Sequence, residues 1–122
     1  MGDGPALGTV GWLDLTVDNA AEVRDFYAAV AGWSFEAHPM GEYEDYVMKT
    51  EGGAVAGVCH RRGVNMGQPG GWIPYIVVAD LDASLAEVAS RSGKILVQRE
   101  GFAVIEDPSG ARLALWCAPD PA

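Results

Sequence analysis

The stretch from Trp12 to Trp33, WLDLTVDNAAEVRDFYAAVAGW, decides the fold of this chain, because a strand and a helix follow each other within it. The strand is predicted from Thr9 to Val17, a run rich in β-branched, aromatic and aliphatic residues that is bounded by Gly8 and by Asp18-Asn19.

The helix is predicted from Asn19 to Ala31. Asn19 and Glu22, three residues apart, resemble a capping box at its start, and Gly32 is a typical stop signal. Apolar residues recur at the spacing of one helix face, at Val23, Phe26, Tyr27 and Val30.

The same order of elements then occurs a second time. Three short strands are expected after the helix, at Trp33–Ala37, Tyr43–Lys49 and Ala54–His60. A glycine-rich linker at residues 63–71 separates them from a second series. That series comprises a strand at Trp72–Val78, a helix from Asp80 or Asp82 to Ser92 that Gly93 ends, and strands at Ile95–Gln98, Phe102–Ile105 and Arg112–Trp116. Residues 107–110, DPSG, have the pattern of a type I turn.

The repeated order predicts an α+β fold with two βαβββ modules in one chain. We expect a single domain in which module one covers about residues 8–62, the linker residues 63–71 and module two about residues 72–117. Each module should form a four-stranded sheet with its helix on one face.

Alternation along the strands predicts which side chains share the other face. Leu13, Leu15 and Val17 are assigned to the helix side, as are Trp72, Pro74, Ile76 and Val78. The opposite faces then carry a mixed set of aromatic and polar groups: Trp12, Asp14, Thr16, Cys59, Tyr75, Arg112 and Trp116. Such a mixture is typical of a small-molecule pocket. The alternative is that the aromatic residues only fill a core, and that Asp14 pairs with Arg112 or lies at a solvated strand end.

Composition excludes several classes of protein. The 122 residues are 49% hydrophobic and 20% charged, as in ordinary globular domains. With 17 acids against 8 bases the net charge is −9, which argues against nucleic-acid binding and is compatible with cationic ligands. No apolar run is long enough to span a membrane, and residues 1–5 lack the start of a secretory signal. Two cysteines, Cys59 and Cys117, are expected as reduced thiols in a cytoplasmic, bacterial protein.

These motifs resemble the vicinal oxygen chelate superfamily, which includes glyoxalase I, the bleomycin resistance proteins and the extradiol dioxygenases. The resemblance extends from about Gly8 to Cys117. The marks of the first module are Val17-Asp18, Phe26-Tyr27 and Gly32-Trp33, and the second module matches at Trp72–Asp82 and Asp107–Leu115. The resemblance implies paired βαβββ modules whose mixed sheets curl around a cup, with the helices outside.

In the metal-dependent members, four ligands from the first and last strands of each module line that cup. Carried over by position, those ligands correspond here to Trp12, Gly57, Ile73 and Ala114, and none of the four supplies a side-chain donor that a divalent ion accepts. We therefore expect no metal and no cofactor.

Other residues could supply donors for a displaced site. His38 is expected in a surface loop, and the acidic run of Glu42, Glu44 and Asp45 at a solvated strand edge. His60 opens the basic cluster His60-Arg61-Arg62. At the rim of a cup it could bind an anionic group or act in acid–base chemistry, and the alternative is an exposed strand end.

The function predicted first is a metal-independent small-molecule binding protein. Its expected ligand-binding residues are Trp12, Asp14, Thr16, Cys59, His60, Tyr75, Arg112 and Trp116, and no catalytic residue is assigned. The alternative is a lyase, isomerase or dioxygenase-type enzyme that uses acid–base residues or a displaced metal held by Asp14 and His60. The expected partners are a small molecule and a second copy of the chain in a homodimer, with no nucleic acid and no membrane.

Overall fold

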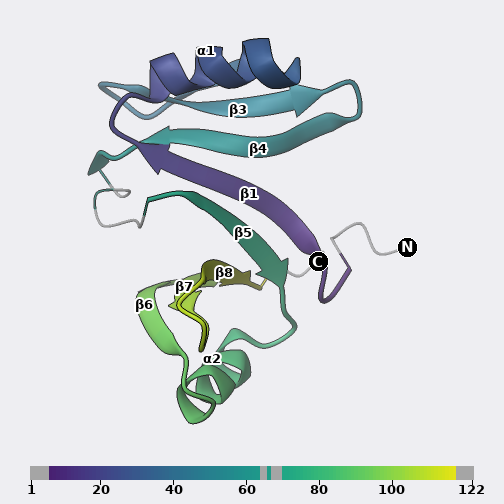
Figure 1. The fold of residues 1–122 in the computed structure, drawn as a ribbon, viewed down its shortest axis with the longest axis vertical. Helices are drawn as coiled ribbons and strands as arrows, with labels where there is room; N and C mark the ends of the chain where they lie inside the picture. The colour runs from purple at the N-terminus through teal and green to yellow at the C-terminus, as the bar shows by residue number, and fades with distance from the viewer. Residues whose placement is uncertain (1–5, 64–65, 67–69, 118–122) are drawn as a thin grey trace. The chain divides into compact units, whose positions relative to one another are not determined.

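The computed structural model describes residues 6–63, 66 and 70–117, which fall into two compact units (Figure 1). One unit is Trp12–Trp72, and the other begins at Ile73 and includes the residues before Trp12. Gly8 and Thr9 join the second unit through two backbone hydrogen bonds, from Gly8 N to Val77 O at 2.8 Å and from Val77 N to Thr9 O at 2.9 Å. Of the expected linker at residues 63–71, positions 64–65 and 67–69 lie outside the described residues.

The first module has the predicted order of elements. They are β1 (Val10–Val17), α1 (Ala20–Ala31), β2 (Ser34–Pro39), β3 (Glu44–Thr50) and β4 (Gly53–His60). The strand order is β2-β3-β4-β1, in which β1 is parallel to β4 and the other pairs are antiparallel. The sheet is therefore mixed, as a βαβββ module requires.

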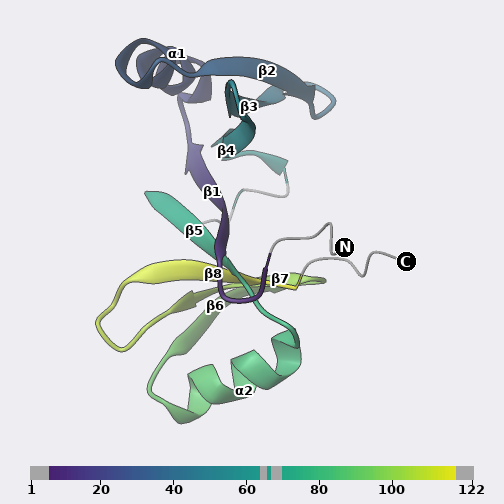
Figure 2. The ribbon, with the colours of Figure 1, turned by 90° about the vertical axis from the view of Figure 1, so that its right-hand side faces the viewer.

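The second module repeats this arrangement. Its elements are β5 (Trp72–Val77), α2 (Leu81–Ser90), β6 (Lys94–Arg99), β7 (Phe102–Glu106) and β8 (Arg112–Trp116). The strand order is β5-β8-β7-β6, with β5 parallel to β8, and α2 covers one face of these strands (Figure 2). The predicted α+β fold with two βαβββ modules is confirmed. In the part of the chain that the structure describes, neither helix is long and apolar enough to cross a membrane.

Each helix packs on the strand face that alternation assigned to it. Under α1 lies a core of Ala20, Tyr46, Met48, Ala56 and Val58, against which Leu13 and Val17 pack. Under α2 lies a core of Leu85, Ala103, Ile105 and Leu115, joined by Ile76 and Val78. Trp72 was expected beside the second helix, but its indole packs on α1 and donates from Nε1 to Tyr27 Oη at 3.0 Å.

The apolar face predicted for α1 includes two residues that do not pack on the sheet. Val23 and Tyr27 pack on the core, whereas Phe26 is 56% and Val30 66% exposed. The stripe that meets the sheet starts at the fully buried Ala20, so it passes to one side of Phe26 and Val30. The capping box is also wrong, because Asn19 Nδ2 donates to Glu22 Oε1 at 3.0 Å and its side chain caps no backbone group.

The two helices end differently. Gly32 ends α1 in the left-handed region, with φ of 73°, as predicted. After α2 the left-handed residue is Ser92, with φ of 71°, so Gly93 has another role than the predicted one. A Cβ on Gly93 would lie 2.7 Å from Val88 Cγ1 and 3.1 Å from two backbone oxygens, which shows that close packing requires this glycine.

Substitutions at these neighbouring positions should therefore have opposite effects. We expect Gly93→Ala to lower the free energy of unfolding by about 1–3 kcal/mol, because backbone atoms must move to admit the methyl group. We expect Ser92→Gly to raise it by about 0.5–1 kcal/mol, because the left-handed conformation costs glycine little. Urea denaturation of both variants measures these changes. A stabilised Gly93→Ala would contradict this packing.

The turn before β8 is confirmed. Gly110 N donates to Asp107 O at 2.9 Å, as in a type I turn. Asp107 Oδ1 accepts hydrogen bonds from Ser109 Oγ at 2.6 Å, Ser109 N at 2.7 Å and Ala111 N at 3.1 Å. These donors, Ser109 Oγ foremost, hold the pKa of Asp107 below its usual range.

Candidate functional site

The face of the first module opposite α1 brings together polar residues from two parallel strands. In the β1–β4 register, Asp14 lies opposite Gly57 and Thr16 opposite Cys59. Alternation adds Trp12 to the same side. We call these five residues, Trp12, Asp14, Thr16, Gly57 and Cys59, the first helix-free face. Four of them were predicted to share a face, and the register supports that prediction.

A short hydrogen bond organises this face. Trp12 Nε1 donates to Asp14 Oδ1 at 2.7 Å, between two partly buried side chains. Gly57 makes room for the pair, because a Cβ there would overlap Asp14 Oδ1 and lie 3.5 Å from Trp12 Nε1. The absence of a side chain at position 57 thus allows the indole and the carboxylate to occupy this part of the face.

Cys59 lies farther along the same face, close to the acidic side chains of Asp14 and Asp45. Thr16, which lies opposite Cys59, is 7% exposed, and Asp45 is 6% exposed. Burial raises the pKa of the Cys59 thiol, and the negative charges of Asp14 and Asp45 and a hydrogen bond to Asp45 raise it further. Cys59 is therefore a thiol rather than a thiolate, and as such is neither a strong nucleophile nor a good metal ligand.

Thiol reactivity tests this arrangement. In a Cys117→Ser variant, we expect Cys59 to react with iodoacetamide at pH 8 at least ~10-fold more slowly than a free cysteine, because little thiolate is present. Adding Asp14→Asn should speed the reaction, because removing a negative charge lowers the pKa of the thiol. Asp25→Asn, an equal change of charge on exposed α1, is the control. Equal rates in the Asp14→Asn and Asp25→Asn backgrounds would contradict the assigned influence of Asp14.

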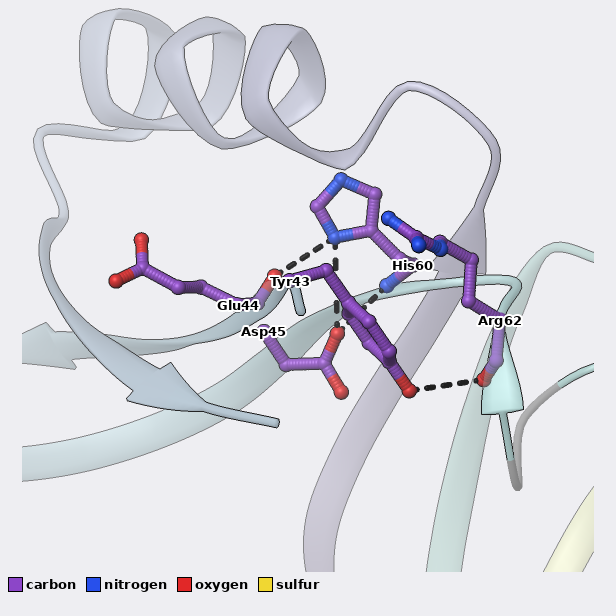
Figure 3. Close-up of polar contacts among 5 residues, drawn as sticks. All are labelled: Tyr43, Glu44, Asp45, His60 and Arg62. Carbon is purple, nitrogen blue, oxygen red and sulfur yellow. Dashed lines mark hydrogen bonds and ion pairs between the residues drawn. The ribbon is translucent and has the colours of Figure 1, made fainter. Parts of the chain in front are cut away.

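His60 does not share this face. Its ring lies against Tyr43 and Tyr46, with ring centroids 5.8 and 6.1 Å apart, and Tyr46 belongs to the core under α1. His60 Nδ1 is 2.7 Å from the backbone oxygen of Glu44, and the His60 backbone N donates to Asp45 Oδ1 at 2.8 Å (Figure 3). His60 was expected at the rim of the cup as a ligand-binding residue; its ring lies on the α1 side of the sheet, away from Trp12 and Asp14, because adjacent residues of a strand face opposite ways.

The two arginines after His60 make intramolecular contacts. Arg61 binds Asp18 Oδ1 through Nη1 at 3.1 Å and Thr16 O through Nη2 at 3.0 Å. The Arg62 guanidinium lies 4.6 Å above the Tyr43 ring, while Tyr43 Oη donates to Arg62 O at 3.0 Å (Figure 3). Arg61 thus connects the end of β4 to the end of β1, and Arg62 contacts the residue before β3. His38, expected in a loop, is an exposed residue of β2.

The second module has its own helix-free face. Ile73, Val104 and Ala114 form a buried cluster there, with Tyr75 and Phe102 packed against it and their ring centroids 5.9 Å apart. Register places Trp116 opposite Phe102 and Arg112 opposite Glu106. Arg112 Nε lies 4.0 Å from Glu106 Oε2, so the structure gives this arginine a carboxylate partner within its own module.

The metal positions implied by the resemblance do not fit a metal. Trp12 and Gly57 offer an indole N–H and no side chain, and Ile73 and Ala114 are 6% and 0% exposed within an apolar cluster. Among the described residues, no group of three or more His, Cys, Asp and Glu side chains is placed to hold an ion. Asp14 and His60, the pair considered for a displaced metal, lie on opposite faces.

Sequence reasoning missed Asp45. The acidic run of Glu42, Glu44 and Asp45 was expected at a solvated edge, but Asp45 is buried beside Cys59 and the backbone of His60. Its alternation with Tyr46 and Met48, which face the core, was the available signal. Its partners depend on the pairing of β3 with β4, in which Tyr46 lies opposite Val58.

Comparisons with known proteins agree with this fold. No family model matches the chain. It is 32% identical over 120 residues to "Putative glyoxylase CFP32" of Mycobacterium tuberculosis and Mycobacterium bovis, an alignment that covers 91% of this chain and 46% of the relative. It is 25% identical over 130 residues to the anthracycline biosynthesis protein DauV of a Streptomyces species, covering 91% of this chain and 47% of DauV. The chain spans about half the length of these curated relatives.

Solved structures share the fold at low sequence identity. Methylmalonyl-CoA epimerase from Mycobacterium tuberculosis superposes with a TM-score of 0.60 at 17% identity, covering 95% of this chain and 93% of the epimerase. The hypothetical protein BH1468 from Bacillus halodurans gives a TM-score of 0.64 at 10% identity, with 94% and 97% covered.

Proposed function

Because the chain belongs to the vicinal oxygen chelate superfamily, we propose that it is a small-molecule binding protein that works without a metal ion. One observation carries this proposal. Where the metal-dependent members have a ligand, Trp12 donates a 2.7 Å hydrogen bond to Asp14, and the carboxylate occupies the space above Gly57. An organic ligand can use both groups directly.

The first helix-free face suits a flat, positively charged ligand. The Trp12 ring offers an aromatic surface, and Asp14 and Asp45 supply negative charge close to Cys59. A cation in contact with an indole gains from the ring quadrupole as well as from the carboxylate. The name of DauV assigns that protein to anthracycline biosynthesis, and flat aromatic ring systems of that kind fit an indole surface. In the second module we propose Tyr75, Arg112 and Trp116 as ligand contacts.

The alternative function is an enzyme of the same superfamily, a lyase, isomerase or dioxygenase-type protein. The name of CFP32, which describes that protein as a glyoxylase, favours the enzyme alternative. On the first helix-free face, Asp14 is the side chain suited to acid–base chemistry, since Cys59 is held as a neutral thiol.

Tryptophan fluorescence tests the binding proposal. We expect 9-aminoacridine, a flat cation, to quench the protein in a saturable way in the presence of EDTA, and anthracene-9-carboxylate, an anion of similar shape, to bind more weakly. A Trp12→Phe variant should lose the share of the quenching that Trp12 contributes and keep that of Trp116, whereas Trp33→Phe should keep the full quenching, because Trp33 is stacked on Tyr27 and packs against the core. Quenching that needs a divalent ion, or that is undiminished in Trp12→Phe, refutes the proposal.

We also propose that the chain forms a homodimer, because two βαβββ modules in one chain can pair with the modules of a second copy. Light scattering on the eluting protein should give twice the mass of the 12.9 kDa chain. A monomer at all concentrations refutes this proposal.

A further inference from the structure

A cavity of about 410 Å³, widely open to solvent, lies on the surface of the second module between α2 and the end of β7. Its walls are mainly apolar and include Val88, Gly93, Ile105 and Pro108. Pockets that hold small organic molecules usually measure ~300–1,000 Å³ and have mostly apolar walls. The size and lining of this cavity are therefore those of a ligand site. It belongs to the helix side of its module and is separate from the first helix-free face.

The first module shows why the cavity exists. Tyr27 stands five residues before Gly32, and Val88 stands five residues before Gly93. The Tyr27 ring packs against Trp33 and Trp72, with centroids 5.9 and 5.3 Å apart, so aromatic rings fill the space beside α1. Valine at the corresponding position of α2 leaves space that, in the described part of this module, no aromatic pair occupies.

Charge at the rim indicates the kind of ligand. Arg91 Nε binds Glu87 Oε1 at 2.8 Å, so these two rim charges largely neutralise each other. Glu106, which also lines the cavity, has Arg112 Nε 4.0 Å from its Oε2. Asp107 remains as a partly exposed carboxylate, and the turn fixes it through three hydrogen bonds to Oδ1. An apolar cavity with a fixed negative charge at its edge complements an apolar molecule that carries an amine.

We propose that this cavity is a second ligand site, which takes an amphipathic amine: a bulky apolar body lies against Val88 and Ile105, and the ammonium group lies at Asp107. The site needs neither a metal nor the Trp12–Asp14 pair. It is thus independent of the function proposed for the first helix-free face.

The probe for this site is 1-adamantylamine, a globular aliphatic amine, compared with adamantane-1-carboxylate, which has the same body and the opposite charge. In ¹⁵N-resolved NMR titrations of the whole chain, the amine should shift the amide signals of Val88, Gly93 and Ile105 and leave the indole signal of Trp12 unchanged. The carboxylate should bind more weakly.

Two variants and a matched control sharpen the test. Asp107→Asn keeps the turn acceptor and removes the charge, and should weaken binding of the amine about 2–5-fold. Ser84→Phe places a ring in the cavity and should abolish binding of the amine. Asp82→Asn, on the same helix but outside the cavity, should change nothing. Shifts confined to Trp12, equal binding of both probes, or unchanged binding in Ser84→Phe overturns the proposal.

Discussion

Replacing Gly57 by alanine is expected to lower the free energy of unfolding by about 2–4 kcal/mol. The new methyl group would overlap Asp14 Oδ1, so the carboxylate must move and lose its 2.7 Å hydrogen bond from Trp12. The cost combines overpacking with the loss of a partly buried hydrogen bond to a charged group. Chemical denaturation measures it, and the indole N–H signal of Trp12 should shift in the folded variant.

Gly52→Ala is the matched control for this substitution. A Cβ at Gly52 would lie 3.6 Å from Thr50 Oγ1, which is an ordinary contact. We expect its effect to stay below about 0.5 kcal/mol, as is usual for surface substitutions. Equal effects of the two alanines would show that Gly57 is not needed for the Trp12–Asp14 pair.

The second large effect concerns Asp14. Asp14→Asn should weaken the binding of 9-aminoacridine at least ~10-fold, because a partly buried carboxylate that meets a cation contributes about 1.5–3 kcal/mol. Asparagine still accepts the hydrogen bond from Trp12, so the fold and the indole signal should persist. Binding of anthracene-9-carboxylate should stay the same or strengthen.

Asp25→Asn makes the same change of charge on exposed α1 and separates a local effect from net charge. Its affinity for 9-aminoacridine should match that of the unmodified chain. If both variants weaken binding equally, the ligand responds to the overall charge of −9 and not to Asp14.

Predictions from the sequence were most accurate where the structure depends only on residues that are close together in the chain. Strand alternation correctly separated Leu13 and Val17 from Trp12 and Asp14, and the DPSG pattern correctly predicted the turn at residues 107–110. Both depend on neighbours within a few residues. The repeated order of elements also predicted the fold, because few known folds contain two βαβββ modules in one chain.

The predictions failed where the position of a side chain depends on residues that are distant in the sequence. Helical spacing could not tell that the buried stripe of α1 starts at Ala20 and misses Phe26. Gly93 has the pattern of a helix stop, but its role depends on Val88 and on a backbone oxygen of Glu106 across the module.

The same limit applies to the candidate site. Asp45 joins Cys59, and Glu106 joins Arg112, through antiparallel registers that sequence alone does not determine. His60 was expected at the rim of the cup from its place at the end of a strand, whereas its contact with Tyr46 of β3 depends on a strand pairing that sequence alone does not determine.

A zinc titration followed by ¹⁵N-resolved NMR tests the central claim most directly, because it observes Trp12 and Gly57 while the ion is offered. With an excess of Zn²⁺ over protein, the account predicts that the indole N–H of Trp12 and the amide of Gly57 keep their positions. Saturable shifts of both signals at one ion per chain would contradict it.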